Sequence, residues 1–343
     1  MERTLIAQNI LARDTSPHSL PIYEVWGHGD FLHICFSSVG CQYRKAGYCT
    51  MCDYGGGRNI TAEEAVSGFL KAIENTPHLV REVLLGTCGS ILDESEMAPQ
   101  VLTALLETVF NHGIPSIILE THYTTVTQAI LEKIQQVLPG REIIIELGFE
   151  SSDPNVLEHS LCKYMDLDAL ADTIRRIKNM GMSPVLNVFL GAPFLTAEEQ
   201  IRDAEKSIAW AVAHGASRVV VFPANIKPNT LLWKLYQAGR YKRISHWELI
   251  ELLSRLDDIL LEKVELSWYG DRQEAGRDIQ ILPPTSCSCC QPSLMSFYQA
   301  FMESFDPRQR KNLLKRLYTQ TSCNCQHDFL ASLHREKRES TDR

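Results

Sequence analysis

A chain of 343 residues, 44% hydrophobic and 22% charged, has the composition of a globular protein and is long enough for a large barrel with an appendage or for two domains. Its formal net charge of −8 argues against a general nucleic-acid binder, although a local basic face stays compatible with it. No apolar run reaches the roughly 18 residues of a membrane span, and residues 1–22 lack the features of a secretory signal. We therefore expect a cytoplasmic protein with no membrane partner.

The middle of the chain alternates short apolar runs with helical patterns. The runs are rich in Val, Ile, Leu and Phe, as expected of strands buried on both faces. The six expected strands are Phe31–Ser37, Glu82–Leu85, Ser116–Leu119, Glu142–Leu147, Pro184–Leu190 and Arg218–Phe222. The expected helices between them are Thr61–Asn75, Met97–His112, Thr125–Val137, Leu167–Met180 and Thr196–His214, with Asp168 and Thr196 as N-caps. The alternation predicts an α/β fold, a partial (β/α)6 TIM-like barrel of parallel strands, with a doubly wound sheet as the alternative.

The last third of the chain is predicted to be helical. The helical patterns there are Leu231–Ala238, His246–Leu261, Gln291–Phe305 and Pro307–Thr319. We therefore expect a barrel core over residues 1–225 and a C-terminal helical, cysteine-rich extension over residues 226–343.

Eleven cysteines are a high number for a chain in a reducing compartment, where grouped thiols more often bind metal than form disulfides. Cys35, Cys88 and Cys162 stand apart and are interpreted as small buried side chains. The others fall into two groups, one near each end of the chain.

The first group, Cys41, Cys49 and Cys52, follows the first expected strand and so lies at the edge of the sheet where ligands bind. Three thiolates can ligate three irons of a 4Fe–4S cluster. The fourth iron then stays open and can chelate the amino and carboxylate groups of S-adenosylmethionine (SAM). The alternatives are a structural zinc site, which would want a fourth ligand nearby, and unrelated structural thiols.

Two further side chains are candidates for cofactor contacts. Asn187 lies on an otherwise apolar strand, and a buried amide must find hydrogen-bond partners. Lys163 is a candidate cation for a carboxylate or a phosphate, with an ordinary surface lysine as the alternative.

The second cysteine group comprises Cys287, Cys290, Cys323 and Cys325, with Cys289 surplus to a four-ligand site. Four thiolates from two loops suit a tetrahedral structural zinc ion. A second iron–sulfur cluster, a soft acceptor for a transferred group, and free thiols are the alternatives.

The spacing C-x7-C-x2-C of the first group departs from the commoner radical SAM spacing C-x3-C-x2-C. With this spacing the chain resembles the branch of the radical SAM superfamily that contains the catalytic subunit of Elongator, and most closely the radical SAM subunit of archaeosine synthase. The segments that carry the resemblance are Gly40–Tyr54, Gly89–Glu94, Glu120–His122, Glu146–Ser151, Ser160–Lys163, Gly191–Thr196, Pro223–Thr230 and Gly239–Trp247.

The resemblance implies how several residues meet the cofactor. Gly89 and Ser90 would present backbone to the methionyl amino group of SAM, and Met51 would lie near its adenine. Glu150 and Ser151 would lie near the ribose or the methionyl group. The resembled family also carries a similar pairing of C-terminal cysteines.

These observations favour an enzyme that splits SAM reductively, of unresolved lyase or transferase class, supplied with electrons by a partner such as flavodoxin or ferredoxin. The first hypothesis for its substrate is a small biosynthetic molecule, with transfer of the 3-amino-3-carboxypropyl group of SAM as a variant. The alternative, implied by the resemblance, is C–N bond cleavage on a 7-deazaguanine base in tRNA. A non-catalytic metal-binding scaffold is the third hypothesis.

Overall fold

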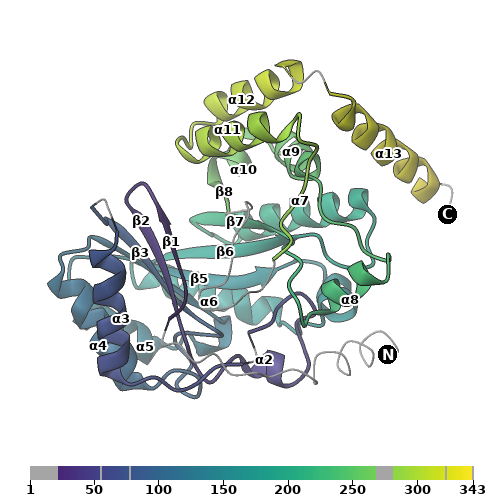
Figure 1. Cartoon of the computed structure of the whole chain (residues 1–343). Coiled ribbons are helices and arrows are strands. Elements are labelled where there is room, and N and C mark those ends of the chain that lie inside the picture. The colour runs from purple at the N-terminus through teal and green to yellow at the C-terminus, as the bar shows by residue number, and fades with distance from the viewer. Residues whose placement is uncertain (1–21, 55, 77–78, 268–280, 321–322, 342–343) are drawn as a thin grey trace.

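One sheet organises the computed structural model, which describes residues 22–54, 56–76, 79–267, 281–320 and 323–341 (Figure 1). In that part of the chain the eight strands lie side by side in the order of the sequence. They are β1 (Ile22–His28), β2 (Phe31–Phe36), β3 (Glu82–Thr87), β4 (Ser116–Thr121), β5 (Glu142–Glu150), β6 (Ser183–Leu190), β7 (Arg218–Pro223) and β8 (Val264–Leu266). β1 pairs with β2 in antiparallel fashion, and every later pair is parallel.

Helices follow most of the parallel strands, and each returns the chain to the amino end of the next strand. Those of the barrel are α2 (Gln42–Lys45), α3 (Ala62–Glu74), α4 (Pro99–Asn111), η1 (Tyr123–Thr125), α5 (Gln128–Val137), η2 (Val156–Leu161), α6 (Leu167–Asn179) and α7 (Ala197–Ala213). Those after β7 are α8 (Leu231–Gln237), α9 (His246–Arg255), α10 (Asp258–Lys263), α11 (Gln291–Met302), α12 (Pro307–Gln320) and α13 (Asn324–Thr341).

The predicted fold class is confirmed, with two strands more than expected. The strand order runs through the sheet without the reversal that a doubly wound sheet requires, which decides between the two alternatives. The sequence analysis missed β1, whose polar residues and Gly27 mask its pattern, and β8, which has only three residues. β8 lies beyond residue 225, so the extension contributes a strand to the sheet. The division of the chain at that residue stays a prediction.

Two details of the helices differ from expectation. Asp166, not Asp168, caps α6, because its carboxylate accepts hydrogen bonds from the amides of Asp168 and Ala169. The helix expected over His246–Leu261 is two helices, since the chain turns at Leu256 and Asp257 caps a new start. Thr196 does cap α7, in a capping box with Glu199.

The two faces of the sheet bury different sets of side chains. Most core residues lie between the strands and the surrounding helices. A second, small cluster lines the concave face of the barrel and comprises Leu84, Ile118, Ile144, Val185 and Val220. Aliphatic side chains therefore fill this part of the concave face.

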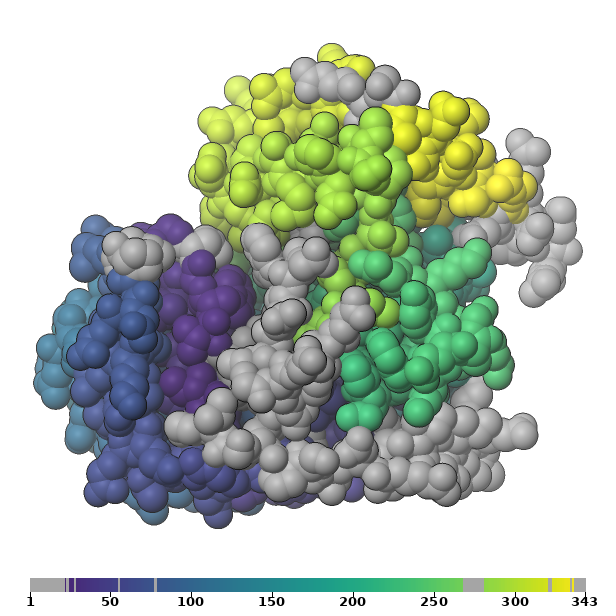
Figure 2. Space-filling model, in the orientation of Figure 1, coloured from purple at the N-terminus to yellow at the C-terminus, as the bar shows by residue number. Residues whose placement is uncertain are grey.

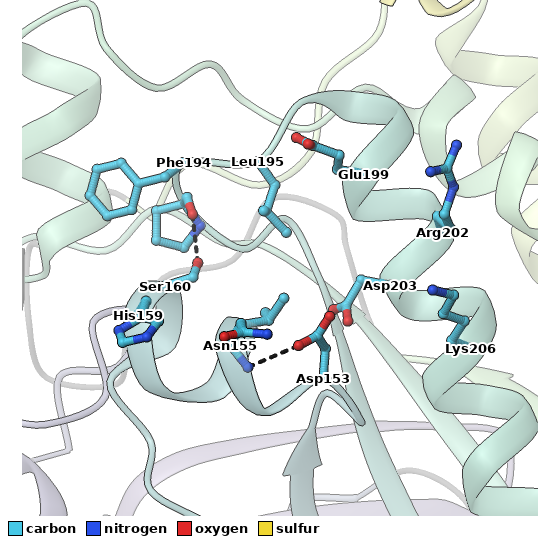
Figure 3. A pocket seen from close by; sticks show the side chains of 12 residues that line it. Asp153, Asn155, His159, Ser160, Phe194, Leu195, Glu199, Arg202, Asp203 and Lys206 are labelled. Atoms are coloured by element: carbon cyan, nitrogen blue, oxygen red, sulfur yellow. Dashed lines mark hydrogen bonds between the residues drawn. The ribbon is translucent and has the colours of Figure 1, made fainter. Parts of the chain in front are cut away.

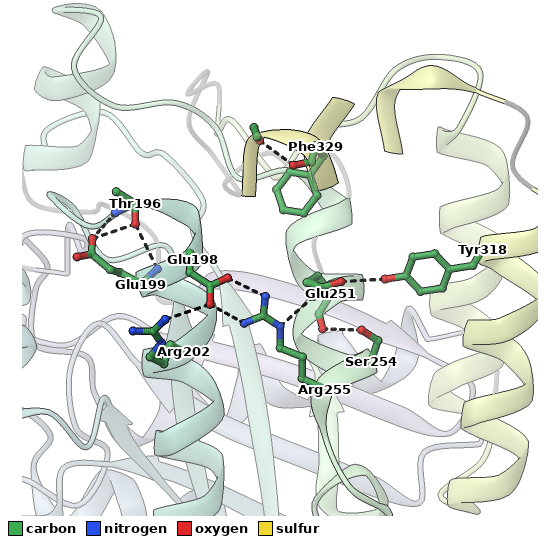
Figure 4. A network of polar contacts seen from close by, with 10 residues as sticks. Thr196, Glu198, Glu199, Arg202, Glu251, Ser254, Arg255, Tyr318 and Phe329 are labelled. Atoms are coloured by element: carbon green, nitrogen blue, oxygen red, sulfur yellow. Dashed lines mark hydrogen bonds and ion pairs between the residues drawn. The ribbon is translucent and has the colours of Figure 1, made fainter. Parts of the chain in front are cut away.

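Of the C-terminal helices, α11 and α12 pack against each other, α11 against β8 and α12 against α9, whereas α13 packs against α7 and α9 (Figure 1 and Figure 2). The buried guanidinium of Arg310 donates to the backbone carbonyls of Leu261, Val264, Phe301 and Ser304 and so joins α12 to three neighbouring segments. Figure 4 shows a second link, in which Arg255 on α9 pairs with Glu198 on α7 at 2.7 Å and with Glu251 at 2.9 Å.

Two further observations concern the membrane and the chain's start. Within the described residues, no helix combines the length and the apolar character needed to cross a bilayer. Residues 1–21, in which no secretory signal is expected, lie outside the described part of the chain.

Candidate active site at the mouth of the barrel

The loop that carries Cys41, Cys49 and Cys52 follows β2, at the carboxyl edge of the sheet. Its seven-residue gap forms the short helix α2, which is absent from the expected elements. Backbone hydrogen bonds fix the loop to its neighbours: the amide of Cys49 donates to the carbonyl of Cys162 at 3.1 Å, and the amide of Leu231 donates to the carbonyl of Thr50 at 3.0 Å. The loops after β5 and β7 therefore position the loop after β2.

A buried carboxylate ties the same loop to the next strand. Glu96 accepts from the backbone amides of Gln42 and Ser90, at 3.0 and 2.6 Å. A side chain at Gly89 would overlap this carboxylate, because a Cβ there would lie 1.9 Å from Oε2 of Glu96. Gly89 is thus required by the close approach of the two loops. The backbone of Gly89 and Ser90 lies beside Cys41, since the same Cβ would lie 3.1 Å from its Cα.

Glu150 and Lys163 form a buried ion pair at this edge, with 2.8 Å between Oε1 and Nζ and side chains 12% and 8% exposed. Nζ of Lys163 also donates to the carbonyl of Gly148 at 2.8 Å. The positive charge of Lys163 lowers the pKa of the nearby thiols of Cys41 and Cys49, although burial outweighs it. The cation expected from the sequence is therefore beside the cysteines and not on the surface.

The three thiols lie in an environment that disfavours free thiolates. Burial raises the pKa of each of them, that of Cys49 to about 12. The charges of Cys41 and Cys49 also act on Cys52, so the three thiols share one electrostatic environment, although they do not form a group as close as the four C-terminal cysteines. Thiols whose pKa is raised in the free protein suit ligands that ionise on binding a metal.

Backbone strain is concentrated around this mouth. Among the described residues, five other than glycine have φ between 52° and 72°, a region costly for L-residues. They are Cys49, Glu150, Cys162, Phe194 and Asn229, and all lie in loops or strand ends at the carboxyl edge. Strain of this kind persists where the surrounding structure demands it, and it is frequent at active sites, which makes this edge a candidate site.

Not every residue assigned from the sequence points to the same place. Asn187 faces the concave side of the sheet and is 5% exposed. Ser151 instead donates to Asp203 on α7 at 2.6 Å, away from the lumen. Met51 is half-buried against the main core. The cofactor roles of these three residues stay predictions.

A cavity of about 380 Å³ lies outside the barrel mouth, between η2 and the start of α7 (Figure 3). Its lining mixes Arg202 and Lys206 with Asp153 and Asp203, so it has no single charge. None of the three N-terminal cysteines lines it. The cavity is therefore distinct from the cysteine site.

Sequence reasoning missed several charged residues of the site. Glu96 holds two loops together, and Lys227 pairs with Asp53 at 3.3 Å, both side chains being under 10% exposed. None of these three residues belongs to a periodic pattern or to a motif of its own. Lys227 and Asp53 do lie inside segments on which the family resemblance rests, and that position is their only signal in the sequence.

The four C-terminal cysteines come together in a second place. Their sulfur atoms all lie within 4.8 Å of one another, and the described part of the chain contains one group of this kind. The closest pairs are Cys290 with Cys325 at 3.1 Å and Cys287 with Cys323 at 3.3 Å. Cys289 is exposed and stays outside the group.

Hydrogen-bond donors support these sulfur atoms. The indole of Trp247 donates to Cys325 at 3.2 Å, and the amide of Cys290 donates to Cys287 at 3.4 Å. Hydrogen bonds, first from Cys323, lower the pKa of Cys287 to about 6. The arrangement fits four thiolate ligands of one ion with no open position.

Similar proteins give this geometry a context. No protein-family model matches the chain. It is 24% identical to archaeosine synthase subunit beta of Methanosarcina acetivorans over 283 residues, which is 80% of this chain and 79% of that protein. It is also 24% identical to an uncharacterized protein of Methanocaldococcus jannaschii, over 68% of this chain and 67% of that protein.

Among solved structures, methylornithine synthase superposes with a TM-score of 0.51 at 16% identity, over 77% of this chain and 69% of that chain. This similarity shows that the two chains share a fold. The resemblance predicted from the sequence is thereby confirmed in both sequence and fold.

Proposed function

We propose that this chain, which resembles radical SAM enzymes in sequence and fold, is an enzyme that binds a 4Fe–4S cluster through Cys41, Cys49 and Cys52 and cleaves SAM reductively. The observation that carries the proposal is one loop that brings three cysteines to the carboxyl edge of the barrel, beside a buried ion pair. A cluster bound there would supply one electron to the sulfonium of SAM. The electron would come from a flavodoxin or ferredoxin in a reducing, cytoplasmic compartment.

The chain's own residues would hold and orient the cofactor. Glu96 keeps the backbone of Ser90 beside Cys41. There a backbone carbonyl would accept a hydrogen bond from the methionyl amino group of SAM. Two buried cations, Lys163 beside Cys41 and Cys49 and Lys227 beside Cys52, would offset the negative charge that builds up when the thiols ionise. Glu150, held by Lys163 in a strained backbone conformation, is placed to accept from hydroxyl or ammonium groups of the cofactor.

The test is product formation by the full chain after anaerobic reconstitution with iron and sulfide. With dithionite and SAM we expect 5′-deoxyadenosine, or methylthioadenosine if the aminocarboxypropyl group is transferred. Cys49→Ser should lose both iron and product, whereas Cys162→Ala, which removes a buried thiol beside it, should keep both. An intact cluster that yields neither product would overturn the proposal.

We also propose that Cys287, Cys290, Cys323 and Cys325 bind a structural zinc ion. The close approach of the four sulfur atoms supports it, since a tetrahedral site needs no further ligand. Metal analysis separates the two sites. The triple alanine variant of the N-terminal cysteines should keep zinc and lose iron, and Cys290→Ser should do the reverse. Loss of both metals in either variant would contradict this division.

For the substrate, a small biosynthetic molecule held in the lumen agrees with the net charge of −8. The similarity to archaeosine synthase subunit beta favours a second candidate, C–N cleavage on a 7-deazaguanine base in tRNA. Retention of tRNA at low salt that falls steeply as salt rises would support the second candidate. No retention at low salt would support the first.

A further inference from the structure

Above its layer of aliphatic side chains, the concave face of the sheet carries charged and polar side chains. Ile118 and Ile144 belong to that layer, and the residues two positions further along the same strands are Glu120 and Glu146. Alternation places them on the same face, and the register of β4 and β5 pairs them directly. Two carboxylates therefore lie side by side, one layer below Gly148 and Glu150.

One neighbour of this pair is a buried amide with a spare acceptor. The side-chain amide of Asn187 donates to Glu146, and both side chains lie in residues that are at most 5% exposed. Oδ1 of Asn187 has no hydrogen-bond partner among the described residues. A buried carbonyl oxygen without a donor is costly, so the site is incomplete without a ligand.

Two glycines let the polar side chains lie over the strands. A Cβ on Gly86 would lie 2.8 Å from Oε2 of Glu120, and a Cβ on Gly148 would lie 2.9 Å from Nζ of Lys163. These glycines keep the carboxylate layer and the ion pair of Lys163 in adjoining positions. The layer therefore lies directly under the proposed cofactor site.

The hydrogen-bonding capacity left unused at Asn187 is that of an acceptor. Asn187 has used an amide hydrogen on Glu146, and its Oδ1 remains as an acceptor without a donor. The matching ligand presents several N–H donors and a positive charge. We propose that Glu146 and Asn187, with Glu120 beside them, bind a protonated amino group of the substrate, an inference that rests on the proposed function.

The electrostatics agree with a cationic occupant. Burial raises the pKa of Glu146 to about 7, and the charges of Glu265 and Glu82 add to it, while the hydrogen bond from Asn187 and the charge of Arg218 oppose it. A bound ammonium group favours the ionised carboxylate and would reverse much of this shift. The free protein therefore holds a carboxylate whose ionised form needs a cation.

The experiment uses the full chain, loaded with its cluster, and n-butylammonium as the probe, with n-butanol as the uncharged match. Titration calorimetry at pH 8 without SAM should show that the ammonium binds at least about 10-fold more tightly than the alcohol. Glu146→Gln and Asn187→Ala should each weaken ammonium binding about 10-fold or more. Glu142→Gln, an exposed residue at the other end of β5, should leave it unchanged.

Three outcomes would overturn the inference: equal binding of the two probes, ammonium binding that survives Glu146→Gln, or loss of SAM affinity in Glu146→Gln without loss of ammonium affinity. The last would assign the layer to the cofactor. Circular dichroism confirms that each variant is folded, and Glu120→Gln gives a second test of the same layer. Failure of the proposed function would show separately, as absence of 5′-deoxyadenosine from a wild-type protein that still binds the ammonium.

Discussion

The two cysteine groups of this chain differ in number, in spacing and in what surrounds them. The N-terminal three lie in one loop at the mouth of the barrel, beside a buried ion pair and strained backbone. The C-terminal four lie within 4.8 Å of one another and receive hydrogen bonds from Trp247 and the backbone. The comparison teaches that the surroundings, more than the thiols, distinguish the proposed cluster site from the proposed zinc site.

The largest expected effect is an exchange of phenotypes between the two groups. Cys49→Ser should lower 5′-deoxyadenosine formation by about 1000-fold or more, since a ligand of the reacting centre is lost. It should change the melting temperature little. Cys290→Ser should keep activity per folded molecule and lower the melting temperature by about 10 °C, because a structural metal contributes folding free energy. Thermal melts and product assays on both variants test this exchange. Loss of activity in both variants with no change in melting temperature would contradict it.

The ion pair at the mouth provides a sharper test of the N-terminal site. Lys163→Met leaves the Glu150 carboxylate buried without its cation, which should cost about 3–5 kcal/mol of unfolding free energy. The double variant Glu150→Gln/Lys163→Met should recover most of that stability but stay about 100-fold less active, because both groups would serve the cofactor. Full recovery of activity in the double variant would assign the pair a structural role only.

On the C-terminal side, Arg310→Met removes one guanidinium from four carbonyl oxygens in a fully buried position. We expect a loss of about 3 kcal/mol or more in unfolding free energy, measured by urea denaturation, because the carbonyls are left without donors. Arg308→Met, an exposed match on the same helix, should change stability by less than about 0.5 kcal/mol. Equal effects of the two variants would show that Arg310 does not hold the extension.

The smallest expected effect concerns Glu146 and depends on pH. Its pKa in the folded protein, about 7, lies above the ordinary value of 4.5. Its contribution to stability is therefore present below pH 4.5 and is lost as pH rises through 7. Glu146→Gln should raise the unfolding free energy at pH 8 by about 1–3 kcal/mol, with the gain shrinking toward pH 5. A gain independent of pH would contradict a raised pKa, and Glu142→Gln serves as the control.

The strands of the barrel were predictable because buried apolar runs are local in the sequence. All six expected strands exist, whereas β8, with only the residues Val264–Leu266, is too short to show a pattern. The N-terminal cysteines were found because their spacing is local as well. Glu96 and the pair of Lys227 with Asp53 were not found, since their roles depend on loops that meet only in the folded chain.

The cysteines of the candidate site were visible in the sequence, and their surroundings were less so. Lys163 was equally consistent with a surface position, and only the fold brings its Nζ within 2.8 Å of Glu150. Asn187 was expected to need partners, and the structure supplies one of them, Glu146. If its Oδ1 meets a ligand, as proposed, the sequence could not show that partner, because it lies outside the chain.

The account rests on three thiolate ligands with one open iron, and electron paramagnetic resonance of the reduced, reconstituted protein tests this most directly. We expect a 4Fe–4S signal that changes when SAM is added, because SAM takes the open position, and that is absent in Cys49→Ser. A signal unchanged by saturating SAM, or one retained in Cys49→Ser, would contradict the account.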